Sequence, residues 1–273
     1  MACFIPNDTS QFSSIFDTVS NILEIGSLKI REDGIYISGL DSSHVSLINV
    51  ELNKDDFKIY NYSEDTDIGI NFKDFVKIIK SGISNEDVQI ICNNSDNLNV
   101  VFKGHGLKKK YSLKILNVDN EDIAISDQDY HLELEIKSKL FSNIVNSILI
   151  TESDSMKFNI YDNKLRIQSF GDHSDIDIEL TKQPMVRKKI KIKKCKNKLE
   201  NNTIIEKEYE LYSCEGKFNT TISINYIKLI SKAFNICQNI MCNLSPDSPL
   251  RIDFMITDNG SMIQYYVSPK IED

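Results

Sequence analysis

The sequence predicts an α+β protein made of two similar domains, with many short strands and few helices. Three observations support this prediction. The chain has 273 residues and 41% hydrophobic content, enough for one large core or two ordinary ones. Its helix-like segments form two pairs, and the order of helices and strands in the first half recurs in the second. We therefore expect a duplicated unit of strands plus two helices.

The first pair of helices is predicted by apolar residues at spacings of three and four. One stripe comprises Phe12, Ile15, Phe16, Val19, Ile22 and Leu23, and residues 7–10 before it are all capping types. The next stripe comprises Phe72, Phe75, Val76 and Ile79. Alternating or β-branched runs, which predict strands, begin at Gly34, Val45, Val88, Leu98 and Tyr111. Each helix is expected to span about ten to fourteen residues.

The second pair repeats this order. Its stripes are Leu140, Phe141, Ile144, Val145 and Ile148, then Ile227, Ile230 and Phe234. The first helix and the run 35–44 recur roughly 130 residues later, and the second helix roughly 150 later. A basic insertion near 187–203 accounts for the difference. Residues 117–130 are acidic and lack helical periodicity, so we expect domains at 1–116 and 131–273 joined by a loop at 117–130.

The charge is unevenly distributed. The formal net charge is −8, but residues 187–198 hold eight cations and no acid. They are Arg187, Lys188, Lys189, Lys191, Lys193, Lys194, Lys196 and Lys198. Without them 24 basic residues face 40 acidic ones, a charge of −16, so any nucleic-acid surface must be a segregated patch. The run itself could bind DNA, RNA, a lipid surface or an acidic partner, although the alternation in 189–193 predicts a solvated hairpin equally well.

Neither export nor a metal centre is expected. No apolar run approaches the 18 or so residues of a membrane helix, and the N-terminus lacks the features of a signal peptide. The six cysteines include no Cys-x-x-Cys pair. Cys237 and Cys242 could begin a zinc site, but neither a second pair nor a neighbouring histidine completes it, so small core thiols are the better interpretation.

Signatures of catalysis also fail. Gly34 and Gly39 have the spacing of a phosphate-binding loop, but Leu40-Asp41 follows where Lys-Ser/Thr is required. The segment from Asp41 to His44 could imitate a nucleophile and a base, yet a turn with an exposed histidine explains it more simply. No cofactor is expected, and no residue is assigned a catalytic role.

The same segment carries a family resemblance. Residues 41–47, Asp-Ser-Ser-His-Val-Ser-Leu, follow Gly34-Ile-Tyr-Ile-Ser-Gly-Leu40 and resemble the signature of the eukaryotic sliding clamps, the proliferating cell nuclear antigen family. The terminus 269–273, Pro-Lys-Ile-Glu-Asp, resembles the tail of that family. Residues 69–80, 249–254 and 264–269 are similar to further stretches of it. The resemblance implies a DNA clamp fold with two similar domains, three chains closing into a ring with helices around the hole.

Membership would place lysines of the helices against duplex DNA. Lys73, Lys77 and Lys80 stand at i, i+4 and i+7 opposite the second apolar stripe, and Lys228 and Lys232 at i, i+4 on the fourth helix. Lysines on any amphipathic helix face water, but their clustering in an acidic chain favours phosphate contacts, which are independent of sequence and sensitive to salt.

The first and third helices depart from the family, whose inner face there is usually basic. The first offers Ser13, Ser14 and Ser20, and the third Asn143 and Asn146. These groups can hydrogen-bond phosphate without adding charge, so DNA binding through these two helices is expected to be weaker. Lys137 and Lys139 could partly compensate.

Two protein-binding surfaces are implied by the resemblance. The first is an apolar groove for a client's short motif, at positions matching Leu40, His44, Val45, Leu47, Ile123, Ile125, Pro249, Tyr266, Val267, Ser268 and Pro269. Ser126 replaces a proline common in the family's linker. The second is the ring seam, where residues 108–116 of one subunit would meet 174–182 of the next. Lys108, Lys109, Lys110, Tyr111 and Lys114 would then oppose Asp175, Asp177 and Glu179.

The sequence, with what the resemblance implies, thus predicts a non-catalytic, homotrimeric sliding clamp that encircles double-stranded DNA. Its expected partners are a DNA polymerase, a clamp loader and nuclease- or ligase-type clients, without a membrane. The alternative is a clamp-derived scaffold, or a monomeric or hetero-oligomeric processivity subunit, that does not encircle DNA. Asn-, Ile- and Lys-rich usage suggests an AT-rich genome of a protist or a large DNA virus. The expected location is the nucleus, or a cytoplasmic replication site if the chain is viral.

Overall fold

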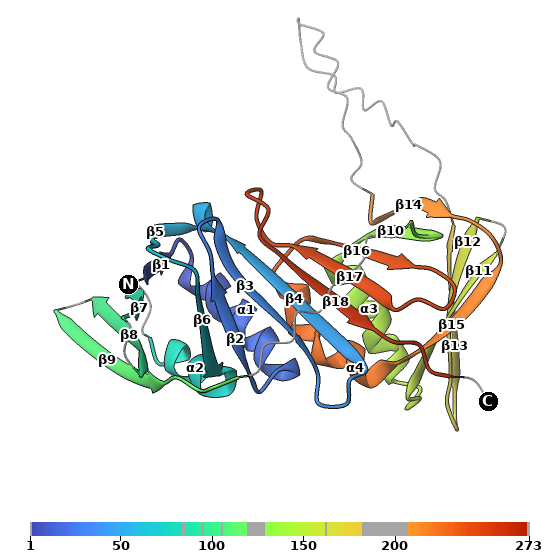
Figure 1. The fold of residues 1–273 in the computed structure, drawn as a ribbon. Coiled ribbons are helices and arrows are strands. Elements are labelled where there is room, and N and C mark those ends of the chain that lie inside the picture. The colour runs from blue at the N-terminus through green and yellow to red at the C-terminus, as the bar shows by residue number, and fades with distance from the viewer. Residues whose placement is uncertain are drawn as a thin grey trace, which may run out of the picture.

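The computed structural model describes residues 2–82, 86–93, 96–104, 106–118, 129–161, 163–181 and 207–271. In its first half the elements are β1 (Ala2–Pro6), α1 (Thr9–Ile22), β2 (Ile25–Ile30), β3 (Gly34–Leu40), β4 (Ser46–Asn53), η1 (Lys54–Asp56), β5 (Phe57–Asn61), β6 (Thr66–Asn71), α2 (Phe72–Lys80), β7 (Asp87–Cys92), β8 (Asn97–Gly104) and β9 (Leu107–Lys114). The predicted predominance of strands is confirmed (Figure 1).

The second half follows the same plan. Its elements are β10 (Leu132–Lys137), α3 (Ser138–Leu149), β11 (Ser155–Tyr161), β12 (Lys164–Phe170), β13 (Asp175–Thr181), β14 (Tyr209–Cys214), β15 (Phe218–Ser223), α4 (Ile224–Leu229), η2 (Ser231–Asn235), β16 (Asn239–Leu244), β17 (Leu250–Met255) and β18 (Met262–Val267). In the first half α1 follows β1 and α2 follows β6. In the second half α3 follows β10 and α4 follows β15, so each helix follows the strand whose number is higher by nine. The predicted duplication is therefore present in the element order.

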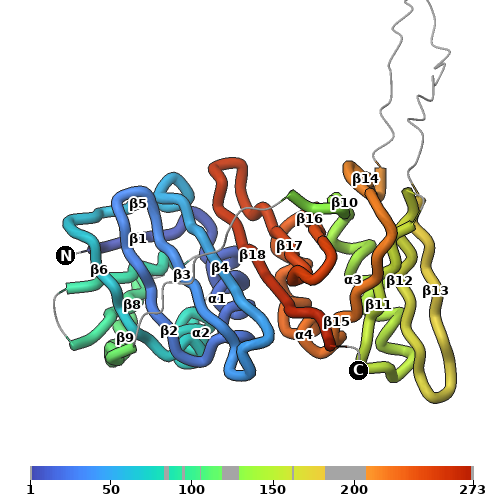
Figure 2. Tube along the Cα trace, turned by 45° about the vertical axis from the view of Figure 1, so that its right-hand side comes forward, coloured from blue at the N-terminus to red at the C-terminus, as the bar shows by residue number. Residues whose placement is uncertain are grey.

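The strands form three sheets, and one of them crosses from one half to the other. The nine-stranded sheet has the order β14-β10-β16-β17-β18-β4-β3-β2-β6, with β5-β1-β7-β8-β9 and β13-β12-β11-β15 as separate sheets. The antiparallel pair β18–β4 joins the halves, where the two strands lie side by side between the domains (Figure 2). With this offset of nine strands, β18 corresponds to β9, and β4 corresponds to β13. In the part of the chain described, β9 and β13 are both edge strands.

All four α-helices lie behind the nine-stranded sheet in the view of Figure 1. Contacts link them in a row, α2 to α1, α1 to η2 and α4, and these to α3. Asp8 caps α1 by accepting hydrogen bonds from the backbone of Ser10 and Gln11, at 2.8 and 3.0 Å, as the capping residues predicted. The apolar stripes face inward, so that Phe16, Phe75 and their neighbours are almost fully buried.

Two helices are shorter than predicted. α2 has nine residues, and α4 has only six because the helix ends at Leu229 and a separate 3₁₀-helix follows. Ile227 and Phe234 are both buried, but on different elements. The apolar spacing was correct about burial, whereas 3₁₀ and α geometry are hard to separate over so short a span.

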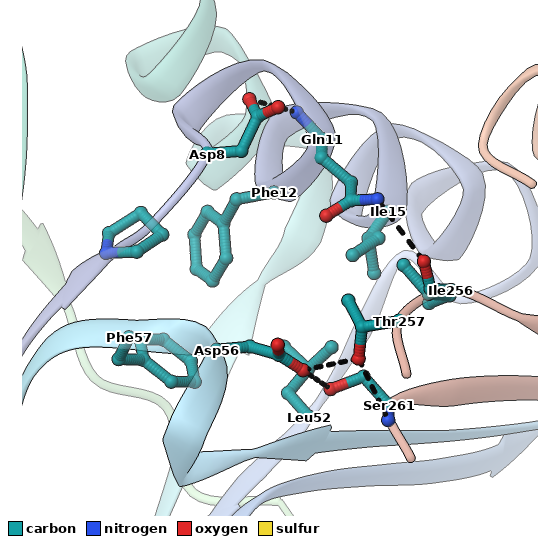
Figure 3. Close-up of a pocket in the computed structure, with 11 residues that line it drawn as sticks. Asp8, Gln11, Phe12, Ile15, Leu52, Asp56, Phe57, Ile256, Thr257 and Ser261 are labelled. Atoms are coloured by element: carbon teal, nitrogen blue, oxygen red, sulfur yellow. Dashed lines mark hydrogen bonds between the residues drawn. The ribbon is translucent and has the colours of Figure 1, made fainter. Parts of the chain in front are cut away.

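A turn of the second domain docks on the first. The carboxylate of Asp56 accepts hydrogen bonds from the hydroxyls of Thr257 and Ser261 in the β17–β18 turn, the first at 2.6 Å, and from the Asn259 amide at 2.8 Å. Figure 3 shows Asp56 with Thr257 and Ser261, and Gln11 of α1 reaching the Ile256 carbonyl. These residues line a cavity of about 20 Å³. The two halves are therefore held together by polar contacts as well as by sheet pairing.

Candidate nucleic-acid and partner interfaces

The predicted lysines of α2 are all exposed, but each has a carboxylate partner. The Nζ atoms of Lys73, Lys77 and Lys80 lie 2.8, 2.9 and 2.8 Å from carboxylate oxygens. The partners are Glu24, Asp74 and Asp17 respectively. Exposed ion pairs of this kind are weak and are screened by salt, so the lysines stay accessible to a stronger anion such as phosphate.

On the second domain, Lys228 is exposed on α4 and Lys232 on η2. The prediction that they share one helix at i, i+4 is wrong, because the α-helix ends between them. Lys232 instead contacts the first domain, with Nζ 2.9 Å from Asp17 and 3.4 Å from the amide oxygen of Asn21. The structure thus brings Lys80 and Lys232 together, although they are far apart in the sequence.

The first and third helices are indeed poor in charge. Asn143, Asn146 and Lys139 are exposed on α3, and Lys137 is half-buried as its N-terminal flanking residue. Ser20, however, was misassigned to the surface of α1. It is 8% exposed, and its hydroxyl donates to the backbone of Asp17 at 2.9 Å.

Asp17 is the residue of this face that the sequence interpretation missed. It lies three or four positions from Ser13, Ser14, Ser20 and Asn21, so helical spacing already placed it among the polar residues of α1. Burial would raise its pKa, but hydrogen bonds and charge from Lys80 and Lys232 outweigh burial, and the pKa is lowered. The carboxylate is therefore ionised at neutral pH.

The turn between β3 and β4 is built around Asp41. Its buried carboxylate accepts from the backbone of Ser43, Val45 and Ser46 at 2.8, 2.9 and 2.6 Å. Burial would raise its pKa, but these backbone hydrogen bonds lower it. His44 is exposed at the tip with φ 56°. The geometry supports a turn with a surface histidine and gives Asp41 no access to a substrate.

The predicted client groove draws on segments that do meet, and we call this area the client surface. Across four adjacent strands, Leu40 pairs with Leu47, Leu47 with Tyr266, and Tyr266 with Arg251. The flanking residues His44, Val45, Pro249, Ser268 and Pro269 lie at the ends of the same strands, and the Ser268 amide donates to the Val45 carbonyl at 2.9 Å. Ile123, Ile125 and Ser126 lie outside the described residues.

Two details of the client surface differ from the prediction. Val267 is 0% exposed because β18 alternates and its side chain points into the core with Tyr265, so it is no surface contact. Arg251 was not predicted. Its guanidinium lies 5.9 Å from the ring centres of both Tyr130 and Tyr266, and 2.8 Å from Asp253. The cross-strand position of Arg251 beside Tyr266 becomes visible only once the register is known.

The predicted seam residues lie on the two edge strands. Lys108, Lys110 and Lys114 are exposed on β9, and Asp175, Asp177 and Glu179 are exposed on β13. Tyr111 points to the opposite face of β9, where its hydroxyl accepts from Ser81 at 3.1 Å. Asp177 and Glu179 already contact Arg166 of β12, both at 3.3 Å.

Lys109 was also expected at the seam, and that expectation is wrong. Alternation along β9 turns it toward Phe102, and its Nζ lies 2.9 Å from the carboxylate of Glu86, which is almost fully buried. It stabilises the inner side of the sheet and offers no free charge to another subunit.

Other predictions concern a metal site, a membrane helix and the basic run. Among the described residues there is no cluster of three or more His, Cys, Asp or Glu residues that could hold a metal ion, and no cysteine within the described ranges is in a disulfide. Cys242 is buried in the core and Cys237 is partly buried, which supports their interpretation as thiols of the interior. No described helix is long and apolar enough to cross a membrane. The basic run 187–198 lies outside the described residues.

Comparisons with known proteins agree with this geometry. The family model for the proliferating cell nuclear antigen N-terminal domain matches residues 6–123, and the model for its C-terminal domain matches residues 124–270. Among similar proteins, the "DNA polymerase sliding clamp" of Thermococcus onnurineus (strain NA1) is 24% identical over 263 residues, covering 96% of this chain and 95% of the relative. That of Thermococcus fumicolans is 24% identical over 264 residues, covering 96% of each. The chain belongs to the proliferating cell nuclear antigen family, and its α+β fold of two similar domains is the clamp fold.

Proposed function

We propose that this protein is a DNA sliding clamp, a non-catalytic ring of three chains that encircles duplex DNA and holds a polymerase and other clients to it. One observation supports the ring above all others. The internal junction pairs β18 with β4, and the two strands that correspond to them, β9 and β13, are edge strands. The same antiparallel pairing between neighbouring chains would repeat the junction around a closed circle.

Charge complementarity supports the same pairing. Lys108, Lys110 and Lys114 lie on the face of β9 turned away from the helices, as Asp175, Asp177 and Glu179 do on β13. A pairing equivalent to β18–β4 would set these two rows side by side on one outer surface. The edge strands would also be covered, which removes the risk of uncontrolled association.

The helix row would then line the hole. It presents lysines to the phosphate backbone and no base-reading element, so contacts would be independent of sequence. The client surface, on the opposite side of the nine-stranded sheet, stays accessible for the short motif of a client in this arrangement. The surface proposed to bind DNA and the surface proposed to bind protein partners thus lie on opposite faces of one sheet.

An order-of-addition experiment tests encirclement without a loader. The protein is incubated at low salt with linear duplex carrying biotin at both ends, and streptavidin is added to block the ends. Excess unlabelled duplex is then added at the same salt, to capture protein that is held only by charge contacts. A ring threaded on the duplex is retained until a restriction enzyme cuts the DNA. Streptavidin added before the protein must abolish retention. Equal retention in both orders would contradict encirclement and would favour a processivity subunit that binds without a closed ring.

A further inference from the structure

The carboxylate of Asp17 occupies the centre of the face that the proposed function assigns to DNA. Its two oxygens are divided between two lysines, Oδ1 lying 2.8 Å from Lys80 Nζ and Oδ2 2.9 Å from Lys232 Nζ. The three groups come from α1, α2 and η2, so the contact spans both domains. A DNA phosphate likewise offers two unshared oxygens and a single negative charge.

Asp17 differs from the other acids that pair with lysines on this face. Its side chain is 18% exposed, whereas those of Asp74 and Glu24 are 53% and 61% exposed. The neighbours Phe16 and Thr18 are buried and fix this turn of α1. Asp74 and Glu24 can therefore swing into water when DNA arrives, but Asp17 remains between its lysines. Because it is less solvated, its interaction is also screened less by salt.

The result is a reduced positive charge where the two domains meet. Lys80 and Lys232 together supply two positive charges, and Asp17 cancels one of them at hydrogen-bond distance. A phosphate approaching either ammonium must share it with this carboxylate or displace it. Its lowered pKa keeps Asp17 charged at neutral pH.

We propose that Asp17 is a built-in phosphate mimic that weakens the hold of Lys80 and Lys232 on DNA, which favours sliding over static binding. The inference rests on the proposed function and adds a residue that sets the affinity for DNA. In the absence of DNA, the same carboxylate holds two like charges together and so stabilises the helix face.

The test is the affinity of Asp17→Asn for a fluorescent duplex, measured by anisotropy over about 50 to 200 mM salt. The variant keeps the side-chain shape and frees both lysines. We expect about two- to fivefold tighter binding at low salt, the size that a weak charge pair gives. The slope of log affinity against log salt should steepen by about one for each additional phosphate that the freed lysines neutralise.

A matched control removes the same charge elsewhere. Asp87→Asn frees Lys58, which lies 2.9 Å from Asp87 on the outer face of the five-stranded sheet. It changes the net charge by the same amount and should leave DNA affinity close to that of the wild type. An equal gain from Asp87→Asn would mean that net charge alone is responsible, and it would overturn the role of Asp17.

Two further variants distinguish a failure of the Asp17 proposal from a failure of the proposed function. Asp17→Ser removes the carboxylate differently and should give the same gain, with thermal melts to identify a variant that does not fold. Unchanged or weaker binding by folded Asp17 variants overturns the proposal, and weaker binding would mean that Asp17 positions the lysines for DNA. Lys77→Glu with Lys80→Glu tests the proposed function itself. If that pair has no effect on affinity, the DNA-binding face is wrong and the proposal fails with it.

Discussion

The junction between the two domains and the two free sheet edges follow one structural plan but differ in chemistry. At the junction, β18 and β4 pair through Leu47–Tyr266 and Asn49–Gln264, with an amide hydrogen bond of 3.1 Å in the second pair. At the edges, β9 presents three exposed lysines and β13 presents three exposed carboxylates. The same topological position therefore carries a single charged residue, Glu51, in the pairing register inside the chain, and rows of charged residues at the two free edges.

This difference indicates two kinds of joint. A joint that never opens gains most from buried apolar area, and Ile48, Tyr265 and Ile263 beneath the junction are each fully buried. A joint between separate chains benefits from charges, which guide assembly and select the correct partner edge. The seam of the proposed ring should then be weakened by salt, whereas the internal junction should not.

The largest expected effect is at the junction. Tyr265 is 0% exposed and its hydroxyl donates to the Tyr226 carbonyl at 3.0 Å. Tyr265→Ala should lower the free energy of unfolding by about 3–5 kcal/mol, since it leaves a cavity and an unpaired carbonyl. Chemical denaturation measures this, and a loss below about 1 kcal/mol would show that the junction is not a packed core.

Charge reversal at the edge should act on assembly and leave folding intact. Asp175→Lys with Asp177→Lys places like charges opposite Lys108, Lys110 and Lys114 in the proposed seam, so the trimer should dissociate into folded chains. Light scattering measures the mass, while the thermal midpoint checks that the fold persists. Asp177 also pairs with Arg166, so its replacement removes an ion pair within the chain as well. The single variant Asp175→Lys is therefore the cleaner test, because the Asp175 carboxylate has no ion pair within the described ranges. An unchanged mass for both variants would place the seam elsewhere.

The smallest effect is expected where the β17–β18 turn docks on the first domain. Asp56→Ala leaves Thr257, Ser261 and Asn259 without their acceptor at a partly exposed site. The free energy of unfolding should fall by about 1–2 kcal/mol. The trimer dissociation constant should change little, because this contact lies within one chain. Asp55→Ala, on an adjacent exposed carboxylate, is the matched control and should be nearly neutral.

Much of the fold was predictable from the sequence, for physical reasons that differ between elements. Stripes such as Phe12–Leu23 and alternating runs such as 175–180 report burial directly, and the repeat revealed the duplication. The break between Lys228 and Lys232 was missed because apolar spacing is similar in α and 3₁₀ turns.

The sites were less predictable, because they depend on contacts between distant segments. Asp17 was visible on the polar side of its helix, but nothing in the sequence placed Lys232 beside it. Arg251 adjoins the client surface only through strand register, and Lys109 turns inward to meet Glu86, which lies more than twenty residues earlier. The assigned DNA, client and seam residues therefore stay predictions until they are tested.

In the proposed ring, neighbouring chains repeat the internal junction through β9 and β13. Native mass spectrometry at low and high salt measures whether they do. We expect a closed assembly of about 94 kDa, three times the 31.3 kDa chain, which dissociates as salt increases. A species of 31.3 kDa at low salt, or an open-ended series of larger masses, would contradict it.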